Sequence, residues 1–177
     1  MNNLIFIQEK DGIEFYIYKP SFLNLYYPCY TGDEVPQYFS RFIHKVRMIR
    51  EIIVSKYQVV YMMKDKAIIG HLVVGRGGSR IEMSTKRDIV IGPIWVVPQQ
   101  RSHGYASKGI KFILNDLKID YEYAYEYIEK DNIPSIRTVQ KNGFKFVDEC
   151  NEYGLFKVIR PSKNGHLNVY RIKNHCS

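Results

Sequence analysis

The run Ile89–Val97, IVIGPIWVV, is the most apolar segment of the sequence and constrains the fold more than any other. A strand that is apolar at nearly every position is typical of a central strand covered on both faces of its sheet. Gly92-Pro93 interrupts the run. Because proline has no N–H to donate, we expect the hydrogen-bond ladder to be broken or bulged there.

The segments around this strand predict a mixture of hairpins and helices. Two β-rich stretches, Leu4–Tyr18 and Gln58–Gly75, each contain a central turn and are predicted to be hairpins. Apolar positions from Val35 to Ile53 recur at spacings of three and four, which predicts one helix. A second helix is expected over about Gly104–Leu117, after the apolar strand.

The C-terminal part alternates between strands and one short helix. Tyr121–Glu129 alternates tyrosine with other residues, which predicts a strand with four tyrosines on one face. Pro134–Asn142 reads as a helix with Gly143 just past its end, and two more strands close the chain. The order of elements predicts one α/β domain over residues 1–177, an α+β mixed sheet flanked by helices.

Charge and cysteine content limit the partners and the compartment. The 177 residues carry 26 Lys and Arg against 18 Asp and Glu, a net charge of +8 that favours polyanions or phosphorylated ligands. No nucleic-acid-binding motif accompanies this charge, so we expect no nucleic acid partner. The sequence has no secretory signal and no apolar stretch of about 20 residues, so we expect a cytoplasmic protein that does not enter a membrane. The three cysteines lie far apart, which predicts free thiols and no metal site.

The loop that follows the apolar strand carries the first chemical signal. Gly104 and Ala106 open the second helix, and Arg101 stands just before them. Small residues at a helix N-terminus let a phosphate approach the unpaired backbone N–H groups, and the arginine adds a full positive charge. Taken alone, the same residues also fit an ordinary tight turn.

A second signal follows the tyrosine-rich strand. Asn132 and Ser135 precede a short helix that ends at Gly143-Phe144. Taken alone, this pattern also fits helix capping, with Asn132 at the N-terminus and Gly143 at the C-terminus.

Together and in this order, the two segments resemble the GNAT superfamily of N-acetyltransferases. The family's acyl-CoA loop has the form Q/R-x-x-G-x-G/A, which here reads Arg101-Ser-His-Gly104-Tyr-Ala106. Its next element has the form N-x-x-S-(x)7-G-F, matched from Asn132 to Phe144. The clear resemblance covers about Ile89 to Val147.

The resemblance implies a fold and a co-substrate. The expected fold is a central mixed sheet of about six to seven strands, in which the two central strands splay apart and admit acetyl-CoA between them. The residues then implied in binding acetyl-CoA are Ile94, Trp95, Val96, Arg101, Ser102, His103, Gly104, Tyr105, Ala106, Asn132 and Ser135. A backbone N–H of Trp95 or Val96 would stabilise the oxyanion of a direct transfer.

The catalytic acid and base follow the family pattern less closely. Family members often carry an acidic base on the strand before the asparagine motif, which selects Glu126, with Glu122 second. Many members also carry a tyrosine four residues before the Gly-Phe pair, but here that position is Val139. Tyr125 and Tyr127 are the candidate proton donors in its place.

The expected activity is transfer of acetyl from acetyl-CoA to a primary amine of a small molecule, an amino sugar being one candidate. Two alternatives stay open: a protein N-terminal or lysine acetyltransferase, and a non-catalytic module that binds acyl-CoA. A narrow, closed acceptor pocket would favour the small molecule, whereas an open groove would favour a peptide. The family also suggests a homodimer formed through the last strands.

Overall fold

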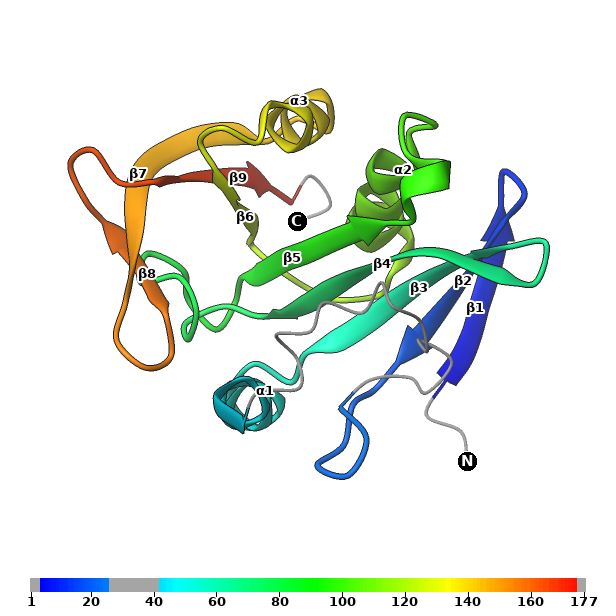
Figure 1. Ribbon diagram of the computed structural model, residues 1–177, viewed down its shortest axis with the longest axis horizontal. Coiled ribbons are helices and arrows are strands. Elements are labelled where there is room, and N and C mark those ends of the chain that lie inside the picture. Colours follow the sequence, from blue (N-terminus) through cyan, green and yellow to red (C-terminus); the bar gives the residue numbers. More distant parts are fainter. Residues whose placement is uncertain (1–3, 26–41, 175–177) are drawn as a thin grey trace.

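A computed structural model describes residues 4–25 and 42–174. They form one mixed sheet of nine strands in the order β1-β2-β3-β4-β5-β6-β9-β7-β8 (Figure 1). The strands are β1 (Leu4–Lys10), β2 (Ile13–Tyr18), β3 (Gln58–Lys64), β4 (Ala67–Arg76), β5 (Ile89–Val96), β6 (Tyr123–Glu129), β7 (Lys145–Tyr153), β8 (Val158–Pro161) and β9 (Leu167–Lys173). The prediction of a mixed sheet is confirmed, and its count of six to seven strands was too low. Both predicted hairpins join the same sheet, and the short strand β8 was not foreseen.

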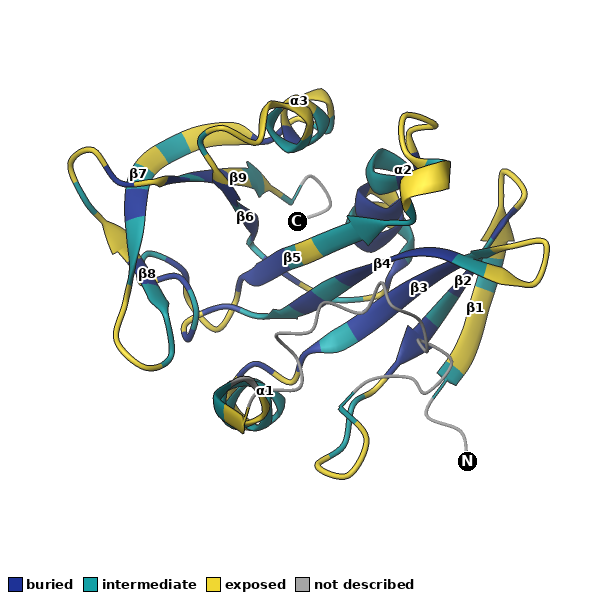
Figure 2. Cartoon of the chain, in the orientation of Figure 1, coloured by how far each residue is buried: buried dark blue, intermediate teal, exposed yellow. Residues whose placement is uncertain are grey.

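Helices cover both faces of the sheet. Helix α1 (Phe42–Val54) lies on one face, and α2 (Tyr105–Lys111) and α3 (Ile133–Lys141) lie on the other (Figure 1). A single π-helical turn, η3 (Phe112–Asp116), continues α2. The strands that these helices sandwich are the most buried part of the molecule, while β1 and the outer hairpin turns are largely exposed (Figure 2).

Strand β5 behaves as its apolar sequence predicts. It pairs with β4, where Leu72 faces Ile94 and Val74 faces Ile91. One residue of β4 and two of β5 separate these pairs, so β5 carries one extra residue. The extra residue falls at Gly92-Pro93, whose peptide bond is cis. The predicted bulge is therefore confirmed, and it follows from the N–H that Pro93 lacks.

The sheet forks between its two central strands. Strands β5 and β6 are parallel and pair only at Ile89 with Ala124 and at Val90 with Tyr125. Beyond these pairs β5 continues beside β4, and β6 continues beside β9 (Figure 1). Among the described residues no further strand pairing joins the facing edges of β5 and β6, and α2 and α3 both begin at the open end of this fork.

Two sequence predictions of which side chains share a face of a helix or strand were wrong. In α1 the residues that pack on the sheet include Met48 and Ile52, whereas Phe42 and Ile53 of the predicted apolar stripe are 81% and 62% exposed. The predicted N-terminal half of this helix lies outside the described residues. Tyr121 does not share a face with the other three tyrosines, because β6 begins only at Tyr123 and Tyr121 packs into the core beneath α2.

Candidate functional site

The loop at the open end of the fork has the geometry of a small anion cradle. Gly104 occupies the N-cap position of α2 in the left-handed conformation, with φ of 76°. A Cβ added to Gly104 would meet no atom of the other described residues within 4 Å, so there is open space beside this residue. The N–H groups of the first turn point into that space. The predicted small-residue opening of this helix therefore has the shape that close backbone approach requires.

Positive charge surrounds this loop. Lys64 Nζ donates to the Tyr105 hydroxyl at 3.3 Å, and Lys108 Nζ lies 5.9 Å from the centre of the Tyr105 ring. The exposed Arg101 donates through Nε to the Val96 carbonyl at 3.1 Å. His103 is exposed and stacks on Tyr105. A phosphate at the cradle would meet several cations within a side chain's reach.

The second predicted segment closes the fork from the other side. Asn132 is the N-cap of α3, and its Oδ1 accepts the Ser135 N–H at 3.3 Å. Near the other end of the same helix, Asn142 Nδ2 donates to Ser107 Oγ of α2 at 2.9 Å. The helix-capping interpretation of Asn132 is thus confirmed. The hydrogen bond between Ser107 and Asn142 holds α2 and α3 together above the fork.

The ladder between β4 and β5 decides which backbone groups face the fork. Val97 N–H donates to Ile69 O at 2.9 Å, towards β4. Successive N–H groups of a strand point to opposite edges. Val96 therefore presents its N–H to the fork, and Trp95 presents its N–H to β4. Of the two donors implied by the resemblance, the structure favours Val96.

A cavity of about 180 Å³ lies on the opposite face, the face of α1. Val90, Gly92 and Pro93 of β5 line it at the point where the fork begins. Its other lining residues come from α1, from β4 and its flanking segments, and from β6: Met48, Glu51, Ser55, Tyr57, Val73, Gly75, Arg76, Arg80 and Tyr127. Most of this lining is apolar, and Glu51 is its one carboxylate.

Arg80 organises the wall of this cavity. Its Nε donates to the Tyr127 hydroxyl at 3.3 Å, and its guanidinium lies 5.1 Å from the centre of the Tyr127 ring. Its Nη2 pairs with Glu152 at 2.7 Å, and its Nη1 donates to the carbonyls of Phe156 and Lys157. Burial alone would lower the pKa of Arg80, but Tyr127 and Glu152 outweigh it and raise the pKa.

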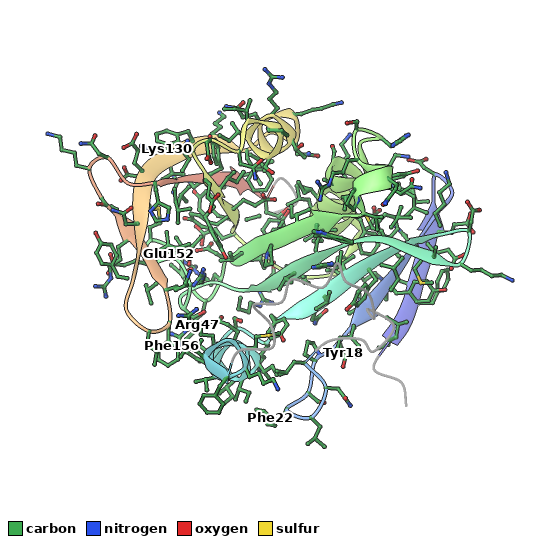
Figure 3. All side chains as sticks on the ribbon, in the orientation of Figure 1. Tyr18, Phe22, Arg47, Lys130, Glu152 and Phe156 are labelled. Carbon is green, nitrogen blue, oxygen red and sulfur yellow. The ribbon has the colours of Figure 1, made fainter. Side chains whose placement is uncertain are left out.

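The turn between β7 and β8 is fixed from two directions. Arg80 bonds it from the loop after β4, and α1 bonds it through Arg47 Nε, which donates to Leu155 O at 2.6 Å. Arg50 of α1 lies 4.7 Å from the centre of the Phe156 ring. Figure 3 shows Arg47, Phe156 and Glu152 gathered where the hairpin approaches α1. Two separate segments, α1 and the loop after β4, therefore hold this turn beside Arg80, which itself lines the cavity.

Glu126 lies on the other face of β6 from Tyr127. It shares this face with Ala124 and Ile128, which pack into the core under α2 and α3. The side chain is 4% exposed, and its Oε1 is buried without a hydrogen-bond partner among the described residues. Burial raises the pKa of Glu126 to about 8, because an apolar environment disfavours the charged form.

The sequence matches the model of the Acetyltransferase (GNAT) family over residues 19–144. This match covers more than half of the chain and includes the fork and the loop after β5. The chain belongs to the GNAT acetyltransferase family. No curated protein matches the sequence significantly.

Solved GNAT structures share the fold across nearly the whole chain. The ribosomal L7/L12 alpha-N-protein acetyltransferase in complex with coenzyme A aligns with a TM-score of 0.64 and 13% identity, covering 97% of this chain and 99% of that one. A GNAT acetyltransferase from Elizabethkingia anophelis with acetyl-CoA bound gives 0.59 and 15%, covering 93% and 99%. A putative GNAT acetyltransferase from Desulfovibrio desulfuricans gives 0.59 and 12%, covering 91% and 98%. At these identities the likeness establishes a GNAT fold.

The structure separates the predicted GNAT catalytic residues into two groups. Tyr127 lines the cavity, and Tyr125 is buried below it on the same face. Glu126 is buried on the opposite face, and Glu122 pairs with Arg87 at 3.1 Å outside the cavity. Their catalytic roles stay predictions, and Tyr127 is the one that meets the cavity.

Sequence reasoning missed Glu51 and Arg80, which line the cavity with Tyr127. Arg80 lies between β4 and β5, in a glycine-rich segment where no spacing or motif singled it out. Among the described residues, no group of three or more His, Cys, Asp or Glu side chains could hold a metal ion. Within the same ranges, no helix has the length and apolar character to cross a membrane.

Proposed function

We propose that this GNAT protein transfers an acetyl group from acetyl-CoA to the primary amine of a small molecule. The observation that carries the proposal is the fork between β5 and β6, with the anion cradle at its open end and the cavity of about 180 Å³ across the sheet. Acetyl-CoA would reach the fork from the side of α2, and the amine would reach it from the side of α1. The two substrates would then meet at the bulge of Gly92-Pro93.

The residues around the fork fit acetyl-CoA in three respects. The open space over Gly104 accommodates a diphosphate against backbone N–H groups. The unpaired edges of β5 and β6 offer hydrogen bonds to an extended chain that carries amides. The buried Oε1 of Glu126 has no hydrogen-bond partner within the part of the chain that the structure describes, and a polar group in the fork would supply one.

Bound acetyl-CoA would supply an activated thioester, and the protein's own groups would position the substrates and hold the protons. The Val96 N–H, three residues along β5 from the bulge, would donate to a carbonyl of the amide-bearing arm rather than to the thioester oxygen. Tyr127 would hold a proton next to the leaving sulfur, with the Arg80 guanidinium beside its oxygen at 3.3 Å. Glu51 would hold the amine, since it is the carboxylate that lines the cavity.

The size of the cavity favours a small acceptor. Ordinary ligand pockets span roughly 300–1,000 Å³. At about 180 Å³ this cavity lies below that range, which favours a compact amine over a stretch of peptide. Acceptance of only a peptide amine would instead support a protein acetyltransferase.

Calorimetric titration with acetyl-CoA tests the proposal. The wild type should bind with micromolar affinity, and Gly104→Asp should abolish binding by placing a side chain and a negative charge in the cradle. Gly154→Asp is a matched control, because Gly154 also has positive φ and open space around its Cβ position but lies in the turn between β7 and β8. Absence of binding to the wild type would overturn the proposal.

A screen of amines then tests transfer. Release of free thiol from acetyl-CoA should depend on a small primary amine. Acetyl-CoA binding without turnover on any small amine or peptide would indicate a non-catalytic acyl-CoA-binding protein.

A further inference from the structure

We propose that the Glu126 carboxyl is a binding group of the fork, which donates a hydrogen bond to a carbonyl oxygen of the amide-bearing arm of acetyl-CoA. The inference rests on the proposed function for its ligand. It gives Glu126 a role different from the general base that the sequence suggested.

The position of Glu126 in the sheet is the first argument. Ala124 and Tyr125 are the last residues of β6 that pair with β5, so Glu126 is the first residue beyond the pairing. The pairing of β6 with β9 stays regular through Glu126, which faces Tyr170. The strand's alternation therefore directs the side chain to the face of α2 and α3, where the fork opens and the anion cradle stands.

The missing partner of Glu126 is the second argument. Its Oε1 is buried without a hydrogen bond among the described residues. Buried polar groups are nearly always paired, and leaving one unpaired costs about 1–3 kcal/mol. The arm of acetyl-CoA carries two amides, and a carbonyl of that arm would pair with this carboxyl once the side chain turns its buried oxygen towards the fork. The same arm can bond the free edge of β5.

The apolar surroundings of the Glu126 carboxyl favour its protonated form, which can donate a hydrogen bond. The buried residues that neighbouring elements contribute to this face of the sheet are apolar or phenolic: Tyr105 and Ile110 of α2, Val139 of α3, Ile89 and Ile91 of β5, and Tyr170 of β9. No carboxylate or cation is among these residues. Burial therefore raises the pKa of Glu126 to about 8, and at neutral pH the carboxyl keeps its proton.

This protonation has a consequence for a ligand that carries negative charge. The neutral carboxyl donates to a carbonyl oxygen, whereas the carboxylate can only accept and brings a buried negative charge beside an anionic ligand. Affinity for acetyl-CoA should therefore fall as Glu126 ionises. A ligand that binds only the protonated form loses affinity in proportion to that fraction.

The test is calorimetric titration of acetyl-CoA into three forms of the whole protein between pH 6 and pH 9. For the wild type, Kd should rise about tenfold between pH 7 and pH 9, because the protonated fraction of Glu126 falls by about that factor. Glu126→Gln keeps a donor and cannot ionise, so its Kd should be close to the wild-type value at pH 7 and nearly constant with pH. Glu129→Gln, at an exposed glutamate of the same strand, should follow the wild type.

The outcomes separate this inference from the proposed function. If the wild type does not bind acetyl-CoA at any pH, the proposed function fails. If the wild type binds and Glu126→Gln shows the same dependence on pH, acetyl-CoA does bind and Glu126 is not its donor. Glu126→Leu gives a second measurement: it removes the donor, so its Kd at pH 7 should exceed that of Glu126→Gln by about tenfold. Equal affinities of these two variants would also overturn the inference.

Discussion

Glu126 should make the stability of the ligand-free protein fall as pH rises through the neutral range. In the folded state its pKa is raised from 4.5 to about 8 by burial. Between these values the unfolded chain has released the proton that the folded chain keeps. Because the folded state then binds more protons, the free energy of unfolding decreases as pH rises. The contribution is fully present below about pH 4.5 and is lost by about pH 8.

The magnitude follows from the same two values. A rise from 4.5 to about 8 corresponds to about 5 kcal/mol at 1.36 kcal/mol for each pKa unit. Between pH 5 and pH 7.5, where most of the change occurs, the wild type should lose about 3 kcal/mol relative to Glu126→Gln. The amide cannot titrate, so this variant retains every other pH-dependent contribution and lacks only this one.

Urea unfolding of both proteins at half-unit steps from pH 5 to pH 8 measures the difference. Linear extrapolation gives each free energy of unfolding, and subtracting the two curves cancels the contribution of His71, which both proteins share. Glu129→Gln should stay parallel to the wild type, since that side chain is exposed. A constant difference between the wild type and Glu126→Gln over this range would refute the buried, neutral state of Glu126.

Three further predictions rest on other contacts. Arg80→Met removes one of the two cationic partners of the partly buried Glu152, which keeps Lys157, and also the bonds from Arg80 to Tyr127 and to two carbonyls; in urea it should destabilise the protein by about 2–4 kcal/mol. Arg160→Met, at an exposed pair with Glu82, should cost less than about 1 kcal/mol. Gly109→Ala places a Cβ against the Leu72 side chain, an overpacking that costs about 1–3 kcal/mol. Calorimetry should show Tm lowered by several degrees, and an unchanged Tm would mean that this contact is loose. Burial lowers the pKa of His71 from 6.5 to about 4. Between pH 6.5 and pH 4 the unfolded chain therefore binds more protons than the folded one, and the free energy of unfolding should fall as pH decreases. In urea unfolding, His71→Gln should flatten this slope.

The sequence predicted the parts of the site that depend on neighbouring residues. The opening of α2 at Gly104 and the capping of α3 by Asn132 follow from residues within a few positions of each other. The bulge at Gly92-Pro93 follows from one missing N–H. Features of this kind depend on residues that are close in the sequence, so the sequence alone predicts them.

The cavity could not be predicted in the same way. It brings Glu51 of α1, Arg80 of a loop and Tyr127 of β6 together from segments far apart in the chain. No spacing in the sequence connects them, because each contact depends on how the strands are ordered. The side of α1 that packs on the sheet was predicted wrongly for a related reason. Met48 with Ile52 and Ile49 with Ile53 both have the spacing of one helix face, and packing against the cluster around Tyr57 selects the first pair.

The fork also divides the sheet into two parts whose neighbouring strands, β5 and β6, share few ladder hydrogen bonds. Two residue pairs between β5 and β6 join them, and Asp88 reinforces the joint by accepting the Tyr123 N–H at 3.0 Å while its other oxygen accepts the Thr85 N–H at 2.7 Å. A ligand lying in the fork would add the cross-strand bonds that the chain itself omits. It would then act as an added strand between two parts that already share one hydrophobic core and the hydrogen bond between Ser107 and Asn142.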